Sequence, residues 1–346
     1  MKIIFAGTPK IVIETLNVIH ASSHEICLIL TNEDKPFGRG KKITKPPVKI
    51  FAEENNIDFR QPTNLKEEGL LNFLKSKQAD LLLVFAYGHI VPEEILNIFK
   101  MGALNIHTSL LPKLRGAAPI QRAIINGDKK TGVTFMKMEK GLDTGPIYNQ
   151  EIVTINEEET SESLSEKISE VSSRKILETI DNIEKNKYIL TPQNHKLATY
   201  APKIIKEESK INWDKEATKI VNQINGLSPS PGTYSLLNKE RINFFLAECT
   251  HVETKGPGIL VEASKENLLI GAKDFCVKIK ELSRSGKKRQ KYESFYNGSR
   301  QLFSKEKYNL LVQCAARNGE TSYQAIERFA YDCTSHKPDY VIIQYG

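Results

Sequence analysis

The chain has few cysteines and no long hydrophobic run, and each lack excludes a class of protein. Its 346 residues include five cysteines, none in a Cys-x-x-Cys pair or at a metal-ligand spacing from a histidine. An odd, scattered set is typical of a reducing compartment, so neither a disulfide framework nor a metal site is predicted. The longest apolar run, residues 81–87, is far shorter than the roughly 20 residues that cross a bilayer. The short apolar start before Gly7 is no signal peptide, so we expect a soluble, cytoplasmic protein.

The first turn, Gly7-Thr8-Pro9, lacks the Gly-x-Gly-x-x-Gly of a dinucleotide site, which excludes a nucleotide cofactor of that type. Apolar segments that read as strands alternate with amphipathic segments that read as helices. This alternation predicts an α/β fold with a doubly wound, mostly parallel sheet. The expected strands are 2–6, 25–31, 81–86 and 103–106, and the expected helices are 10–20, 47–55, 65–76, one opening at Pro92, 121–125 and 160–185.

The pattern changes in the second half of the chain. A helix is expected at 214–225, and short strands follow with turn signals at Asn238, Gly256, Gly258 and Gly271. Short strands between such turns indicate a small β-barrel. We therefore predict a catalytic domain at 1–186, a linker at 187–207, a β-domain at 208–300 and an atypical tail at 301–346.

Positive charge is concentrated in two regions. The net charge is +7, residues 33–49 carry six basic and two acidic residues, and residues 201–300 carry 18 basic and 12 acidic ones. Localised basic faces are typical of proteins that bind nucleic acid. A solvated, lysine-rich surface is the alternative reading of the same charges.

An amide and an imidazole stand close together at the end of a predicted strand. Asn105 and His107 differ by two positions, so both side chains leave the same face of that strand. In open α/β sheets, ligands bind outside the carboxyl ends of the strands. A carboxylate follows in Gly-Leu-Asp-Thr-Gly, at Asp143. An amide and an imidazolium can stabilise an oxyanion, and a carboxylate can favour the charged imidazole, so the three groups suit formyl or acyl transfer to an amine.

These motifs resemble a known family. Asn-Ile-His-Thr-Ser-Leu-Leu-Pro at 105–112, Arg-Gly-Ala-Ala-Pro-Ile-Gln at 115–121 and Gly-Leu-Asp-Thr-Gly-Pro at 141–146 resemble the folate-dependent formyltransferases. The resemblance runs from Met1 to about residue 300. It implies a formyltransferase-type sheet domain followed by an OB-like barrel. Residues 117–121 and the basic segment 33–42 favour the branch of the family that acts on transfer RNA.

The resemblance also implies partners and site residues. The donor would be 10-formyltetrahydrofolate, the acceptor would be initiator methionyl-tRNA, and no metal is required; we expect a monomer. Catalysis would fall to Asn105, His107 and Asp143. The donor would be bound by Phe85, Ala86, Tyr87, Gly88, His89, Ile90, Ser109, Leu110, Leu111 and Pro112. The RNA would be bound by Lys35, Arg39, Lys41, Lys42, Lys287, Lys288 and Arg289.

Some of these assignments leave alternatives open. Plain core packing is an alternative for Phe85 and Ile90, and Arg115 could serve only to brace its loop. His89 departs from the family, in which an apolar residue often takes this place; we expect a surface histidine there, with contact to the polar part of the donor as the alternative. Gly88 suits a tight turn or a close ligand approach.

The tail departs from the family. Residues 317–328 and 338–346 weakly resemble two blocks of SGNH-type esterases, but no Gly-Asp-Ser nucleophile block is present. We expect no esterase activity, and a fused or truncated reading frame, a structural extension and a functional segment all remain open. The rival functions are a formyltransferase for another amine such as a nucleotide sugar, a nucleic-acid-binding module with an inactive α/β domain, and a hydrolase supplied by the tail.

Overall fold

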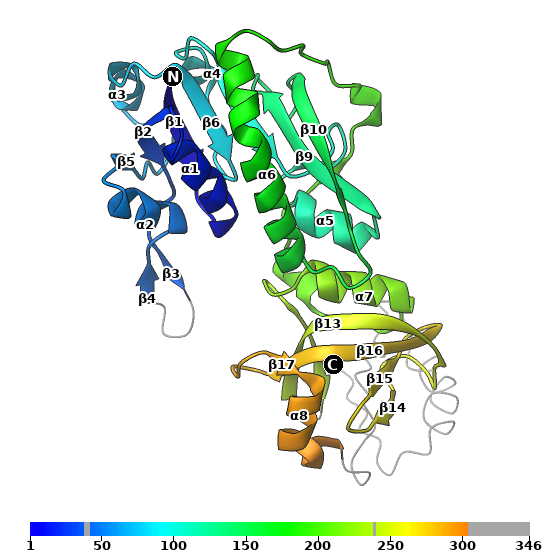
Figure 1. The fold of residues 1–346 in the computed structure, drawn as a ribbon. Coiled ribbons are helices and arrows are strands. Elements are labelled where there is room, and N and C mark those ends of the chain that lie inside the picture. Colours follow the sequence, from blue (N-terminus) through cyan, green and yellow to red (C-terminus); the bar gives the residue numbers. More distant parts are fainter. Residues whose placement is uncertain (38–41, 238–239, 304–346) are drawn as a thin grey trace, which may run out of the picture. The chain divides into compact units, whose positions relative to one another are not determined.

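The computed structural model describes residues 1–37, 42–237 and 240–303, which fall into two compact units (Figure 1). Unit 1 comprises residues 1–209 and 222–232, and unit 2 comprises residues 210–221 and those from 233 onward. In the described ranges no helix is both long and apolar enough to cross a membrane.

A seven-stranded sheet forms the centre of unit 1, in the order β10-β9-β7-β6-β1-β2-β5. The five strands from β7 to β5 run parallel, and β9 pairs antiparallel with both β7 and β10. The predicted doubly wound, mostly parallel sheet is confirmed, although the sequence interpretation missed the two antiparallel strands. The strands are β1 (Lys2–Gly7), β2 (Glu25–Leu30), β5 (Phe59–Arg60), β6 (Leu81–Phe85), β7 (Ala103–His107), β9 (Lys130–Lys137) and β10 (Ile147–Thr154).

Helices cover both faces of this sheet because alternate strand residues point to opposite sides. Ile3 and Phe5 of β1 belong to one core cluster, and Ile4 and Ala6 belong to another. The first cluster includes apolar residues of the 3-10 turn η1 (Lys10–Val12), α1 (Ile13–His20), α2 (Pro47–Glu54), α5 (Pro119–Asn126) and α6 (Ser161–Glu184). The second includes residues of α3 (Leu70–Ser76) and α4 (Glu93–Leu96).

Two helix predictions differ in outcome for local reasons. The long helix begins where predicted, because the Thr160 side chain accepts a hydrogen bond from the Ser163 backbone and Ser163 bonds back to Thr160. The helix predicted at 65–76 is wrong in its first five residues. Gly69 has a left-handed φ of +81°, so helical structure starts only at Leu70.

The segment predicted as a linker is an ordered part of unit 1. It contains the 3-10 turn η2 (His195–Leu197), a two-residue strand, β11 (Tyr200–Ala201), and the start of the 3-10 turn η3 (Lys206–Ser209). β11 pairs in parallel with β8 (Arg115–Gly116). The chain after α6 therefore returns to the Arg-Gly motif near the predicted site.

The basic region after β2 forms a short hairpin where the sequence predicted only a loop. β3 (Lys35–Phe37) pairs antiparallel with β4 (Lys42–Thr44). The predicted RNA-binding residues Arg39 and Lys41 lie between these strands, outside the described residues.

Unit 2 contains an antiparallel sheet in the order β12-β13-β16-β15-β14, with β17 paired to β16. Its elements are β12 (Thr233–Leu237), β13 (Glu240–Glu253), β14 (Leu260–Ala263), β15 (Leu268–Gly271), β16 (Phe275–Arg284), β17 (Gln290–Lys291), α8 (Tyr292–Ser299) and the turn η4 (Arg300–Phe303). Helix α7 (Ala217–Gly226) begins in unit 2 and ends in unit 1. The predicted small β-domain of short strands is confirmed, and its strands pair antiparallel.

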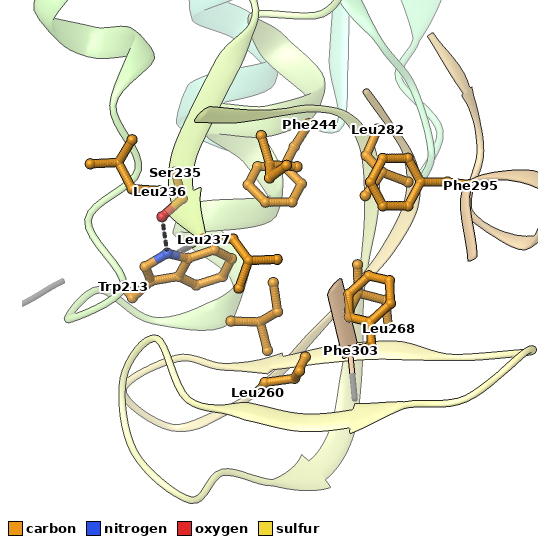
Figure 2. Close-up of a pocket in the computed structure, with 12 residues that line it drawn as sticks. Trp213, Ser235, Leu236, Leu237, Phe244, Leu260, Leu268, Leu282, Phe295 and Phe303 are labelled. Carbon is orange, nitrogen blue, oxygen red and sulfur yellow. Dashed lines mark hydrogen bonds between the residues drawn. The ribbon is translucent and has the colours of Figure 1, made fainter. Parts of the chain in front are cut away.

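Side chains from both ends of this sheet meet in one apolar interior (Figure 2). Leu237 of β12 and Leu260 of β14 line the same cavity of about 20 Å³, so the sheet curls around its core. The indole nitrogen of Trp213 donates to the Ser235 hydroxyl, 3.1 Å away, at the edge of this core. Phe303 also lines the cavity, so ordered packing continues three residues beyond the predicted domain boundary at 300.

Candidate active site

Asn105 and His107 lie two residues apart at the carboxyl end of β7, as the spacing predicted. β7 lies between β6 and β9, with Asn105 opposite Val84 and Met136 and His107 opposite Thr134. Because β6 and β7 run parallel, the loops that leave them start at the same edge of the sheet. The Asn105 side chain is half-buried, and no hydrogen bond to its amide is found among the described residues. Its N–H groups are therefore free to meet a ligand.

The two ring nitrogens of His107 have different surroundings. The side chain is 7% exposed, and Nε2 lies 2.9 Å from the carbonyl oxygen of Leu114. A carbonyl only accepts, so we assign the proton to Nε2. Nδ1 lies 3.6 Å from Oδ2 of Asp143, which is too long for a good hydrogen bond but close enough for the carboxylate to attract the ring when it carries a positive charge. Nδ1 is therefore the nitrogen that can gain or lose a proton in a reaction.

The loop that carries Asp143 is tightly constrained. Asp143 has a left-handed φ of +52°, and its Oδ2 accepts a hydrogen bond of 2.8 Å from the backbone N–H of Gly116. A Cβ atom at Gly145 would collide with the carbonyl oxygen of Lys137, so only glycine allows the loop to approach β9 so closely. Left-handed conformations of non-glycine residues are uncommon and cluster at functional sites.

The Ser-Leu-Leu-Pro loop is fastened to the two antiparallel strands. Thr134 of β9 donates through its hydroxyl to the Ser109 carbonyl at 2.6 Å and accepts from the Leu111 N–H at 3.1 Å. Gln150 of β10 donates to the Leu111 carbonyl at 2.9 Å. Ser109 itself is fully buried, and its hydroxyl donates to the Lys113 carbonyl. Of the four predicted donor-binding residues here, Leu110 and Pro112 are half-buried, whereas Ser109 and Leu111 are buried.

In the loop after β6, mainly backbone groups are accessible to a bound ligand. The rings of Phe85 and Tyr87 are buried in the two cores, 0% and 2% exposed, so neither ring is open to a ligand. Burial raises the pKa of Tyr87 far above its usual range, and its hydroxyl has no partner among the described groups. Ala86 and Gly88 are exposed with left-handed φ values of +50° and +82°. Ile90 is 89% exposed, which rules out core packing for it.

His89 is not the free surface histidine that the sequence suggested. Its Nε2 lies 2.7 Å from the Asn32 side-chain oxygen, and its ring packs against Tyr87 with centroids 4.8 Å apart. The side chain is half-buried, so it braces the loop after β6 against the end of β2.

Sequence reasoning missed one residue of this region. Gln193 lies in the predicted linker, yet it is 7% exposed and donates to the Asp143 and Gly145 carbonyls at 2.9 and 2.7 Å. The buried Arg115, which the sequence placed in the motif without a firm role, donates to the other end of the same amide. No local pattern marks Gln193, because its partners lie 48 to 78 residues away in the sequence.

The predicted RNA-binding residues fall in both units. In unit 1, Lys35 is exposed on β3, and Lys42 begins β4. In unit 2, Lys287 and Lys288 are exposed in the turn between β16 and β17. Arg289 forms an ion pair with Glu281 and lies 5.6 Å from the Phe245 ring centre, so its guanidinium already has partners within the protein.

Known proteins are similar to this chain in sequence and in fold. The family described as "Formyl transferase" matches residues 1–180, and "Formyl transferase, C-terminal domain" matches residues 203–300. The methionyl-tRNA formyltransferase of Thermodesulfovibrio yellowstonii is 41% identical over 296 residues, covering 86% of this chain and 95% of that protein. The enzyme of the same name from Carboxydothermus hydrogenoformans is 41% identical over 303 residues, covering 87% and 98%.

Among solved structures, the N-formyltransferase of Helicobacter canadensis bound to folinic acid and dTDP-3-aminofucose is similar, with a TM-score of 0.60 at 23% identity. The similarity covers 81% of this chain and 98% of that one, and at this identity it concerns the fold alone.

Proposed function

Because this chain belongs to the formyltransferase family, we propose that it transfers a formyl group from a folate carrier to the α-amino group of methionine on initiator transfer RNA. The relatives that match along most of its length are named methionyl-tRNA formyltransferases. The observation that carries the proposal is the placement of a free amide and a histidine–carboxylate pair at the carboxyl end of β7.

The donor is 10-formyltetrahydrofolate, which enters as a substrate. The exposed backbone at Ala86 and Gly88 suits the edge of the pterin ring, because that edge presents donors and acceptors in an amide-like pattern. The half-buried Leu110 and Pro112 supply apolar contact from the loop after β7. Since β6 and β7 are parallel neighbours, both loops flank the same edge of the sheet as Asn105.

The transfer proceeds by direct attack. The amine nitrogen forms a bond to the formyl carbon, and the formyl oxygen becomes an oxyanion that accepts a hydrogen bond from the Asn105 amide. His107 takes the surplus amine proton at Nδ1, with Asp143 stabilising the resulting imidazolium. Collapse of the intermediate breaks the bond between the formyl carbon and the folate nitrogen, which receives the proton. Removal of one such oxyanion donor typically costs about 10²–10³ in rate.

Transfer RNA is held by basic residues of both units. Lys35, Arg39, Lys41 and Lys42 contribute from the hairpin after β2, and Lys287 and Lys288 contribute from the turn before β17. Arg289 supports that turn through Glu281 rather than binding phosphate. Such contacts release counterions, so affinity should fall steeply with salt.

A nucleotide sugar is the second candidate acceptor. The Helicobacter canadensis structure, which contains an amino-sugar nucleotide, favours it by fold alone. The basic hairpin and the basic turn of unit 2 favour RNA instead, because a small nucleotide sugar would contact few of these charges.

A formylation assay separates these acceptors. The full chain is incubated with 10-formyltetrahydrofolate and either charged initiator transfer RNA or an amino-sugar nucleotide, and formylated product is measured. Formylation of the sugar but not the RNA would overturn the proposal. A matched chain ending at Phe303 should retain transfer activity, because the packed core of unit 2 includes Phe303. Neither chain should hydrolyse a p-nitrophenyl ester.

RNA binding is tested with the triple variant Arg39→Ala, Lys41→Ala, Lys42→Ala. We expect weaker binding at low salt and a shallower dependence of log affinity on log salt, with an unchanged KM for the folate donor. Unchanged affinity and slope would show that the hairpin does not bind RNA.

A further inference from the structure

The Gln193 amide bridges the Asp143 loop to a buried arginine. Its Nε2 donates to two backbone carbonyls of that loop, Asp143 at 2.9 Å and Gly145 at 2.7 Å. Its Oε1 accepts from Arg115 Nε at 3.2 Å and Nη2 at 2.6 Å. All its described contacts therefore join the catalytic loop to Arg115.

Arg115 fixes the orientation of this amide. A guanidinium has only donors and a carbonyl only accepts, so the oxygen of Gln193 must face Arg115 and its nitrogen must face the loop. Arg115 is 3% exposed, and its Nη2 also lies 3.1 Å from Nδ1 of His195. A flipped amide would place its NH₂ group against the guanidinium and its oxygen against two carbonyls, so the arrangement has one stable form.

The hydrogen bonds join the Asp143 loop, Gln193 and strand β8 in a closed circuit around the Asp143 carboxylate. Gly116, the neighbour of Arg115 in β8, donates its N–H to Oδ2 of Asp143 at 2.8 Å. One two-residue strand therefore holds the Asp143 side chain directly and the Asp143 backbone through Gln193. The circuit sets where Oδ2 stands relative to Nδ1 of His107, at 3.6 Å.

We propose that Gln193 is a positioning residue for formyl transfer, which acts by holding Asp143 at its working distance from His107 and is oriented by Arg115. The proposal rests on the proposed function of this site. Loss of Gln193 frees the carbonyls of a loop with left-handed backbone at Asp143, and the loop relaxes away from His107. Displacements of about 1 Å at a catalytic group can cost roughly a hundredfold in rate.

The test compares Gln193→Ala and Gln193→Glu with the matched control Asn194→Ala. Asn194 is the exposed neighbour of Gln193, and its side chain accepts only from the Lys196 N–H among the described groups. Glutamate can still accept from Arg115 but cannot donate to the loop carbonyls. We expect both Gln193 variants to lower kcat about tenfold to a hundredfold with the KM for folate changed less than threefold. The control should stay within twofold of the wild type.

A double-variant cycle with Asp143→Asn identifies the route of the effect. If Gln193 acts through Asp143, Gln193→Ala should lower kcat less than about threefold further in the Asp143→Asn background. Multiplicative losses would overturn the proposal, as would a Gln193→Glu variant with wild-type kcat.

A spectroscopic readout keeps the inference separate from the function. In ¹⁵N NMR spectra at one pH, the His107 Nδ1 resonance of Gln193→Ala should move toward its position in Asp143→Asn, and Asn194→Ala should leave it unchanged. An unmoved resonance would overturn the positioning role. If instead the wild type formylates no acceptor but the resonance moves as expected, the proposed function fails and the positioning role stands.

Discussion

Two buried histidines lie at opposite edges of the same sheet in unit 1. His24 directly precedes β2 and lies at the amino edge of the parallel strands, whereas His107 ends β7 at the carboxyl edge. Each faces a carboxylate: Asp181 in the last turn of α6 for His24, and Asp143 for His107.

The two rings differ in how many of their nitrogens are hydrogen-bonded. His24 has Nε2 at 3.0 Å from Asp181 and Nδ1 at 3.2 Å from the Met1 backbone nitrogen, with its side chain 3% exposed. His107 has one nitrogen bonded to a carbonyl and the other 3.6 Å from its carboxylate. A ring bonded at both nitrogens has no proton to exchange with a ligand, so we interpret His24 as structural and His107 as catalytic.

The carboxylates near His24 also have structural partners. Glu184 joins His24 and Asp181 to form a group whose ligand atoms are close enough to hold a metal ion. The hydrogen bonds of His24 and the 3.2 Å contact between Glu184 and the Met1 nitrogen account for this arrangement without an ion. Proximity of a histidine to carboxylates therefore does not by itself distinguish a site from a structural cluster, whereas a ring nitrogen without a hydrogen bond does.

The largest expected effect is that of His107→Ala, and comparison with His24→Ala tests the contrast between the two histidines directly. His107→Ala should lower kcat at least tenfold, up to about a thousandfold, with a smaller loss of stability than His24→Ala, because it removes one buried hydrogen bond, to the Leu114 carbonyl. His24→Ala should leave kcat within about threefold of the wild type but lower the free energy of unfolding by roughly 1–3 kcal/mol, because it removes two partly buried hydrogen bonds. Steady-state kinetics and thermal unfolding of both variants measure this, and the contrast breaks if His24→Ala loses as much kcat as His107→Ala.

Asn105→Ala is expected to have the next largest effect on kcat. The open amide of Asn105 has no structural partner among the described residues, so its loss should lower kcat at least tenfold without lowering the melting temperature. Near-native turnover would show that this amide does not stabilise the oxyanion.

The two carboxylates are compared by Asp143→Asn and Asp181→Asn. The first should lower kcat by at least tenfold and change the shape of its pH–rate profile, because a neutral partner no longer favours the imidazolium. The second should leave both kcat and the profile unaltered. A profile that Asp143→Asn leaves unchanged would contradict the assigned role of this carboxylate.

The smallest effect concerns stability against pH. Burial acts to raise the pKa of Asp181, but the hydrogen bond from His24 and the charge of Lys185 outweigh it and hold the pKa below its usual range. A carboxyl whose pKa is lower when folded stabilises the protein above its unfolded pKa of about 3.9, and that contribution is lost as pH falls through the folded value. Asp181→Asn should therefore lower the melting temperature at pH 7 and flatten its decline below about pH 4. Parallel melting curves for the two proteins across this range would refute the expectation.

The sequence predicted those parts of the fold that depend on local patterns. The apolar run at 81–87 predicted a buried parallel strand, and the helix predicted at 160–185 is observed as α6. Strands β9 and β10 were missed because their apolar residues are mixed with lysine, threonine, asparagine and glutamine, which suits an antiparallel pair at a sheet edge. The helix at 65–76 was drawn too long because the conformation of Gly69 is not readable from periodicity.

By itself, the sequence determined that Asn105 and His107 share one face at the end of a strand, since side-chain alternation is a local property of the backbone. Only the tertiary structure decided which nitrogen of His107 is hydrogen-bonded and which is not, because its two partners come from different loops. It alone also joined Gln193 to Asp143 across about 50 residues, through pairing of β11 with β8. Contacts at such separations follow from packing of the whole chain, and no short motif records them.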